Sequence, residues 1–168
     1  MEDPGIDGDY EVRMVREEDW PHIEPLWHSF YEHQIAHGML LELPPDAYQS
    51  WVASMRTVLG RFAFVFVVQE GEDLVGFFAG RIRSLPSYFG GHQVGFFSDL
   101  FVIDSHRRRG VADILFSTGT SWFRDQGIDR LELHVVSNNT EAREFFRRRG
   151  MIEELTLMVS TGKDAGAG

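Results

Sequence analysis

The chain has 168 residues, 43 % of them hydrophobic, which suits one domain with a substantial core. It contains no cysteine, and this excludes disulfides, thiolate metal sites and cysteine nucleophiles. The net charge of −10 argues against nucleic-acid binding, and no apolar run approaches the roughly 18 residues of a membrane-spanning helix.

The first half of the chain predicts one strand followed by two helices. Residues 10–15 alternate enough for a strand, and the acidic residues 17–19 offer an N-cap and first turn for a helix that runs past Tyr31. Residues 43–46 open a second helix, which ends at Gly60.

The second half predicts an antiparallel hairpin and then alternating helices and strands. Residues 62–68 are apolar throughout and read as a central strand, paired with a strand over 74–82. The elements expected after this hairpin are a strand over 94–103, a helix over 111–126, a strand over 131–136, a helix over 140–149 and a closing strand over 151–159.

This order predicts an α/β fold of the α+β type, with a mixed, mostly antiparallel central sheet and helices on both faces. We expect one domain over residues 10–160, without internal repeats. Residues 1–9 are acidic and polar, the opposite of a secretory signal, so we expect a disordered leader and a cytoplasmic protein. The small residues of 161–168 predict a disordered tail.

Charge is unevenly distributed along the chain. Residues 1–60 hold twelve acidic residues against three arginines, and six of the sixteen basic residues fall in the triplets 107–109 and 147–149. This pattern suits a protein that holds an anionic ligand and accepts a cationic one. Random clustering on a solvated surface gives the same pattern.

The most informative motif is the turn Arg107-Arg108-Arg109-Gly110-Val111-Ala112, which lies between a predicted strand and a predicted helix. Unused backbone N–H groups and the helix dipole meet there and form a cradle for an anion. No Gly-Lys-Ser/Thr follows, which excludes a phosphate-binding P-loop. A helix N-terminus with exposed arginines is the structural alternative.

A second motif follows about 29 residues after Gly110, where Asn139-Thr140-Glu141-Ala142 precedes Phe145-Phe146 and the basic residues 147–149. Together the two motifs resemble the GNAT family of N-acetyltransferases. The resemblance covers roughly residues 10–159 and is strongest over 94–151. It implies the acyl-CoA N-acyltransferase fold, and homodimers are common among relatives.

The resemblance also implies how acetyl-CoA is bound. The arginine and glycine turn holds the pyrophosphate, and the exposed edge at residues 100–102 pairs with the pantetheine as an added strand. A backbone N–H near Leu100 or Phe101 stabilises the oxyanion. The expected cofactor-binding residues are Leu100, Phe101, Val102, Arg107, Arg108, Arg109, Gly110, Val111, Ala112, Asn139, Ala142 and Phe146.

Phe146 departs from the family pattern, which has a tyrosine there to protonate the departing thiolate. General acid catalysis contributes about 10²- to 10⁴-fold, yet a thiol with a pKa of about 8.5 already leaves well. Water or Ser137 could take over the role. Phe146 therefore keeps open a non-catalytic alternative, an acyl-CoA-binding regulatory module.

Asp99 and His134 are the candidate catalytic residues. Asp99 lies among apolar residues on a predicted strand, where a carboxylate tends to have a raised pKa and could act as the general base. The alternative for Asp99 is a surface position on an alternating strand. His134 could act as base or proton relay, or as a hydrogen-bonded structural histidine.

In the family, the region between the first two helices forms the acceptor wall, which makes Tyr31, Glu32 and His33 the candidate substrate residues. His33 and His37 are four residues apart and could share a metal, but the spacing supplies no third ligand, so we expect no metal.

The sequence thus predicts an acetyl-CoA-dependent N-acetyltransferase that acts by direct attack of a primary amine. The acidic first half favours a small cationic acceptor such as a polyamine, an aminoglycoside-like amine or an amino acid. The alternatives are the non-catalytic module and a protein N-terminal or lysine acetyltransferase. The expected partners are acetyl-CoA, the amine and a second copy in a homodimer, without nucleic acid or membrane.

Overall fold

The computed structural model describes residues 8–161, so most of the predicted leader and tail lies outside the described residues. The helices and strands are β1 (Tyr10–Met14), α1 (Trp20–Ala36), α2 (Ala47–Arg56), β2 (Ala63–Glu70), β3 (Asp73–Ser84), β4 (Gln93–Val102), α3 (Val111–Asp125), β5 (Leu131–Leu133) and α4 (Thr140–Arg147). Short 3-10 helices cover Glu17–Asp19, Ser87–Phe89 and Asp104–His106. No helix within residues 8–161 is long and apolar enough to cross a membrane.

The strands form one sheet in the order β1-β2-β3-β4-β5. Neighbouring strands are antiparallel except β4 and β5, which are parallel. The predicted mixed, mostly antiparallel sheet is therefore confirmed. The run of six buried residues that opens β2 fits its interior place in the sheet, because both of its faces are covered.

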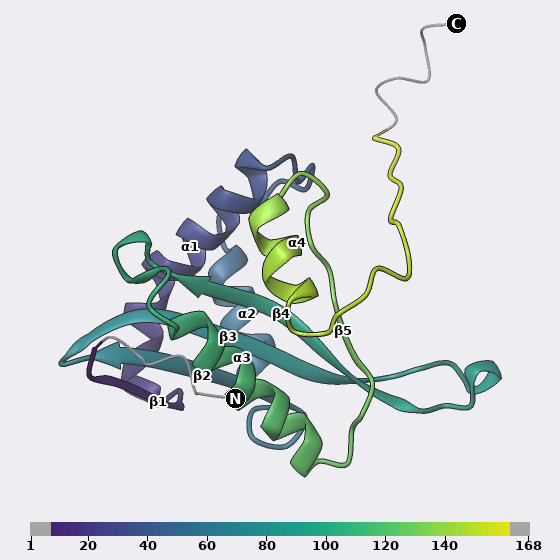
Figure 1. The fold of residues 1–168 in the computed structure, drawn as a ribbon, viewed down its shortest axis with the longest axis horizontal. Helices are drawn as coiled ribbons and strands as arrows, with labels where there is room; N and C mark the ends of the chain where they lie inside the picture. Colours follow the sequence, from purple (N-terminus) through teal and green to yellow (C-terminus); the bar gives the residue numbers. More distant parts are fainter. Residues whose placement is uncertain (1–7, 162–168) are drawn as a thin grey trace, which may run out of the picture.

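Helices cover both faces of the sheet, as predicted (Figure 1). The apolar sides of α1 and α2 form one core with alternate residues of β2 and β3, and α3 forms the second core on the opposite face. Gly119 lets α3 lie close to the sheet, because a Cβ atom there would sit 2.5 Å from the Phe78 ring. The two cores fix β4 between α1 and α3.

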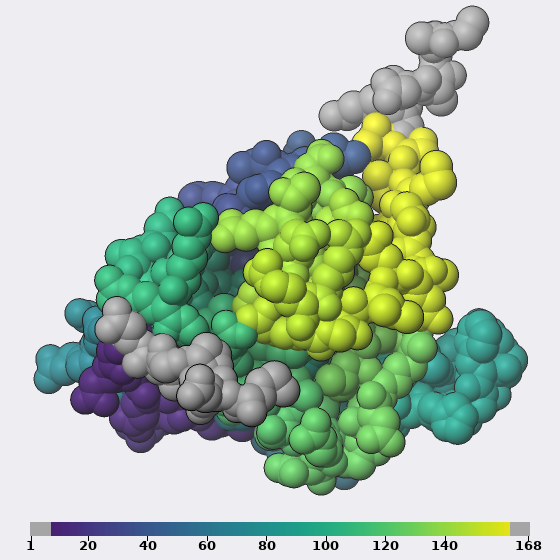
Figure 2. Space-filling view, viewed as in Figure 1, coloured from purple at the N-terminus to yellow at the C-terminus, as the bar shows by residue number. Residues whose placement is uncertain are grey.

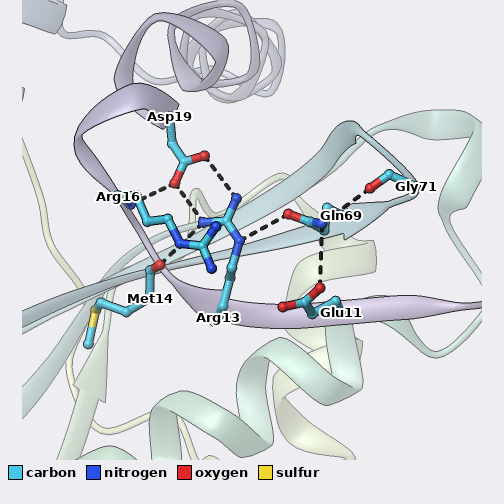
Figure 3. Close-up of polar contacts among 7 residues, drawn as sticks. All are labelled: Glu11, Arg13, Met14, Arg16, Asp19, Gln69 and Gly71. Carbon is cyan, nitrogen blue, oxygen red and sulfur yellow. Dashed lines mark hydrogen bonds and ion pairs between the residues drawn. The ribbon is translucent and has the colours of Figure 1, made fainter.

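The start of α1 is fastened to β1 by a partly buried ion pair (Figure 3). The guanidinium of Arg13 donates to both carboxylate oxygens of Asp19, at 2.7 and 2.9 Å, and the backbone N–H of Arg16 donates at 2.6 Å. The hydrogen bond from Arg13 lowers the pKa of Asp19. Asp19 occupies the predicted N-cap position, but its side chain makes no capping bond to α1.

A β-bulge in β4 changes which side chains face which core. Ala79 pairs with Asp99 and Gly80 with Phe97, which leaves Ser98 as the extra residue. Before the bulge Phe97 faces the α3 core, and after it Phe101 faces the α1 core. The extra residue therefore turns Asp99 toward α1, which an unbroken alternation would not do.

The C-terminal part differs from prediction at two points. The strand predicted over 131–136 ends at Leu133, because its ladder with β4 ends there. The closing strand predicted over 151–159 is wrong for the single chain, since these residues have no secondary structure and are almost all exposed. They have the composition of a strand but pair with no neighbour within the described residues.

Candidate active site

The candidate site is a groove where β4 and β5 separate. Their ladder ends at the pair of Phe97 and Leu133, whereas β4 continues to Val102. The groove holds a cavity of about 280 Å³ lined by residues of α1, β4, the turn before α3, the segment after β5 and α4. It thus brings together parts of the chain that are more than 100 residues apart.

The free edge of β4 presents backbone groups to this groove. The N–H of Ile103 donates to Val75 of β3 at 2.9 Å, and the N–H of Gly95 donates to Arg130, next to β5, at 2.9 Å. Along a strand, the backbone N–H and C=O groups of successive residues point to opposite sides. Because Ile103 faces β3, the backbone groups of Phe101 also face β3, and those of Leu100 and Val102 point into the groove. Of the two N–H groups predicted to stabilise an oxyanion, the one at Leu100 faces the groove.

The turn before α3 has the backbone conformation of an anion cradle. Arg108 has a φ of 60° and Gly110 a φ of 81°, both left-handed, immediately before the helix. Such turns direct successive N–H groups to one point at the positive end of the helix dipole. Arg108 is one of the rare non-glycine residues with this conformation, a strain that is typical of ligand-binding turns.

The side chains of this turn have different environments. Arg107, Arg108, Gly110 and Ala112 line the cavity, whereas Arg109 is exposed outside it. Arg107 supports the end of β4, because its Nε donates to the carbonyl oxygen of Val102 at 2.9 Å. Val111 is 1 % exposed and packs in the α3 core, so its backbone alone could reach a ligand.

The start of α4 forms the opposite wall. The buried Asn139 caps the helix, since its Oδ1 accepts the N–H of Ala142 at 3.0 Å. The cavity is lined here by Asn139, Ala142 and Phe146. The ring centroid of Phe146 lies 5.8 Å from that of Phe116 on α3. The conformation at Asn139 therefore positions the wall that carries Phe146.

Asp99 lies at the inner end of the groove, 2 % exposed. Its Oδ1 accepts a hydrogen bond from Tyr31 at 2.9 Å and its Oδ2 accepts one from the indole N–H of Trp51 at 3.3 Å. Burial raises the pKa of Asp99, against the smaller lowering effects of hydrogen bonding by Ser98, Tyr31 and Trp51 and of the charge of Arg81. Burial, followed by the charge of Asp99, also raises the pKa of Tyr31.

The remaining predicted residues are divided between the groove and other surfaces. His134 lines the cavity with its ring edge-on to Phe96, at 5.0 Å between centroids. His33 also lines it, and burial lowers the pKa of His33. Tyr31 contacts the site through Asp99, whereas Glu32 is exposed on another side of α1.

Sequence reasoning missed Gln34, which lines the groove beside His33. Its Oε1 is buried, and no residue within 8–161 donates a hydrogen bond to it. Phe30, one helical turn earlier, also lines the cavity. The spacing of these two residues on α1 is the signal that could have identified them.

The groove thus has a cationic mouth and a carboxylate at its inner end. This arrangement suits a long ligand with phosphates at one end and a reacting group near Asp99. Its middle offers partners for amides, the free edge of β4 and the carbonyl of Gln34. No group of three potential metal ligands occurs among residues 8–161.

Comparisons with known proteins identify the family and the fold of the chain. Residues 17–151 match the model of the acetyltransferase (GNAT) family. No curated protein sequence matches the chain. The aminoglycoside N-acetyltransferase AAC(6')-Iy, solved with CoA, superimposes with a TM-score of 0.73 at 19 % identity, over 94 % of this chain and 97 % of that one.

Two further solved structures share the fold. A tetramutant of the BH1408 protein from Bacillus halodurans gives a TM-score of 0.75 at 19 % identity, over 89 % of this chain and 98 % of that one. Glucosamine-6-phosphate N-acetyltransferase from Arabidopsis thaliana gives a TM-score of 0.66 at 13 % identity, over 90 % of this chain and 97 % of that one. With the family model spanning most of its length, the chain belongs to the GNAT family of acetyltransferases, as its two motifs predicted.

Proposed function

We propose that this acetyltransferase moves an acetyl group from acetyl-CoA to the primary amine of a small cationic acceptor, which attacks directly. One observation carries the proposal: a buried carboxylate with a raised pKa, Asp99, lies at the inner end of a groove whose mouth is an anion cradle. The free edge of β4 connects these two features, and an extended cosubstrate can pair with such an edge.

The residues that line the groove fit acetyl-CoA, which supplies the acetyl group as a thioester. Backbone N–H groups from Arg108 to Ala112 would hold the pyrophosphate at the start of α3. The edge of β4 at Leu100 and Val102 would pair with the amides of the pantetheine, and Oε1 of Gln34 would accept a further amide N–H. Phe146 would lie near the sulfur.

Asp99 would take the proton from the acceptor ammonium, directly or through a water molecule. Its raised pKa makes it a stronger base than an exposed carboxylate. Trp51 and Tyr31 hold the carboxylate in place through one hydrogen bond to each oxygen. The N–H of Leu100 would stabilise the negative charge that develops on the acetyl oxygen.

A cationic acceptor is supported by the surroundings of Asp99. The carboxylate is held by hydrogen bonds from Tyr31 and Trp51, and its negative charge in a buried site attracts an ammonium group. The acidic first sixty residues add a negative field that favours the approach of cations. The AAC(6')-Iy structure, which shares the fold, is described as an aminoglycoside N-acetyltransferase.

The acceptor class is tested by comparing kcat/KM for polyamines, aminoglycosides and amino acids with that for a monoamine of similar size. We expect polycationic amines to exceed the monoamine by about tenfold or more, because each additional favourable charge interaction adds up to about 1 kcal/mol. Equal rates for all small amines, together with a high rate on a peptide, would instead favour the protein-modifying alternative.

Phe146 favours a second candidate, a non-catalytic module that binds acyl-CoA. If the enzyme is active, Phe146→Tyr adds a proton donor for the thiolate, and we expect kcat to rise by about two- to tenfold, less than a full general acid provides, because the thiolate leaves readily. The measurement is steady-state thiol release, with Phe145→Tyr as the matched control. A fall in kcat for Phe146→Tyr alone would contradict the placement of this residue near the sulfur.

A further inference from the structure

Two arginines lie beyond Asp99 on the same face of the sheet. Ala79, Arg81 and Arg83 are alternate residues of β3, so they share the face against which α1 and α2 pack. Ala79 pairs with Asp99 of β4. Arg81 and Arg83 therefore follow Asp99 toward the β3–β4 hairpin, which is the teal lobe that projects at the right of Figure 2.

The guanidinium of Arg81 and the carboxylate of Asp99 are held by neighbouring positions of α2. Nη2 of Arg81 donates to Oγ of Ser54 at 3.4 Å and to Sδ of Met55 at 3.0 Å. Trp51, which donates to Asp99, lies one helical turn before Ser54. In keeping with this placement, the charge of Arg81 acts on Asp99 and lowers its pKa, against the larger effect of burial.

Arg83 is held over an aromatic ring at the outer end of this face. Its guanidinium carbon stands 3.3 Å from the ring centre of Phe96, which in turn lies edge-on to His134 in the groove. Burial, followed by the charge of Arg81, lowers the pKa of Arg83. The two guanidinium groups are thus close enough to repel each other.

Neither arginine has a carboxylate partner among residues 8–161. The ion pairs of this part of the chain include neither Arg81 nor Arg83. Glu132 is near enough for its charge to act on Arg83, but it pairs with Arg130 at 2.6 Å instead. An anion bound to both guanidinium groups would offset their repulsion.

We propose that Arg81 and Arg83 bind an anionic group of the acceptor, a carboxylate or a phosphate, while the acceptor's amine lies at Asp99. Guanidinium groups suit this role, because their paired N–H donors match the oxygens of both anions. The inference rests on the proposed function and selects among its acceptors, of which an amino acid carries both groups. Polyamines and aminoglycosides interact only with the Asp99 end.

Binding of matched acceptor pairs to the CoA complex tests this proposal without any turnover. Isothermal titration compares each common amino acid with its carboxamide, and phosphoethanolamine with ethanolamine. We expect the anionic member of at least one pair to bind about tenfold more tightly or better, the usual strength of a hydrogen bond to a charged group. The pairs that show the preference distinguish a carboxylate from a phosphate. An equal Kd for both members of every pair overturns the proposal.

Variants of the two arginines locate the anion. Arg81→Gln should reduce the preference to about twofold or less, and Arg83→Gln should reduce it at least about threefold. Arg83 is exposed and makes no contact with α2, so its variant gives a result even if Arg81→Gln disturbs that helix. The matched control Arg124→Gln removes an exposed arginine of α3, on the opposite face of the sheet, and keeps the full preference. An unchanged preference in both Arg81→Gln and Arg83→Gln also overturns the proposal.

The outcome is separable from that of the acetyl-transfer reaction. Absence of thiol release with every amine contradicts the transfer, whatever the Kd values are. Equal binding of the anionic and neutral members, with release from other amines intact, contradicts only the role of the two arginines.

Discussion

Asp99→Asn should lower kcat/KM for acetyl transfer by about 10² to 10³, within the range of a lost general base. Asparagine has the shape of aspartate and keeps both contacts, because its oxygen can accept from Trp51 and its amide can donate to the hydroxyl of Tyr31. The change therefore removes the base and leaves the groove intact. Isothermal titration should give a Kd for CoA within about twofold of wild type, since the cradle is at the other end of the groove.

The pH dependence distinguishes a base from a structural residue. Burial raises the pKa of Asp99, so the wild-type rate should increase with pH as the carboxyl ionises, at a pH above the usual range for aspartate. The rate of Asp99→Asn should not show this increase with pH. A variant that loses activity equally at every pH, or that loses CoA binding in parallel, would contradict the assignment of the base.

Stability provides the folding control for this variant. Because the folded state holds the proton of Asp99 more tightly than the unfolded state, ionisation of Asp99 lowers stability as pH rises from the usual carboxyl pKa to the raised one. Asparagine removes this penalty. The melting temperature of Asp99→Asn at neutral pH should therefore equal or exceed that of wild type, which differential scanning fluorimetry measures.

Gly110→Asp should weaken CoA binding by about 100-fold. The carboxylate would stand in the cradle where the pyrophosphate is expected, and opposing like charges cost several kcal/mol. Aspartate tolerates the left-handed φ of 81° better than most residues, so the loss reports charge more than backbone strain. Gly110→Asn tests the same shape without the charge and should weaken binding by about tenfold or less.

Gly127 provides a matched control at the other end of α3. It has a φ of 74°, and a Cβ atom there meets nothing within 4 Å. Gly127→Asp should leave the Kd for CoA unchanged in isothermal titration. The extra loss of Gly110→Asp over Gly110→Asn should shrink at high salt. Equal losses for the two aspartate variants would refute the cradle.

The sequence predicted most of the elements because their signals are local. The apolar run that forms β2 and the glycine at the end of α3 are visible without knowledge of the fold. The turn before α3 could be predicted as a candidate anion cradle for the same reason, since its basic residues are continuous in sequence. The left-handed conformation of Arg108 could not, because no residue preference indicates it.

The burial of Asp99 could be predicted only as one of two alternatives. A regular strand would place Phe97, Asp99 and Phe101 on one face, and nothing in the sequence marks Ser98 as the residue of a bulge. The contact of Asp99 with Tyr31 joins residues 68 positions apart and depends on how α1 packs on the sheet. Local patterns cannot supply that information.

The error at the C-terminus has a different cause. Residues 151–159 have the composition of a strand, but a strand also needs a partner, and the described chain provides none. A sequence pattern indicates which secondary structure a segment can form. It does not indicate which strand the segment pairs with. This segment is therefore where the sequence prediction failed, because its partner strand is not among the described residues.

Thiol release from acetyl-CoA in the presence of primary amines tests the central claim most directly. The protein has no cysteine, so a disulfide reagent reports only the CoA that is released. We expect release that depends on the amine, saturates with it and falls by about 10² or more in Asp99→Asn. Tight CoA binding without release for any polyamine, aminoglycoside, amino acid or peptide would contradict the account and identify an acyl-CoA-binding module instead.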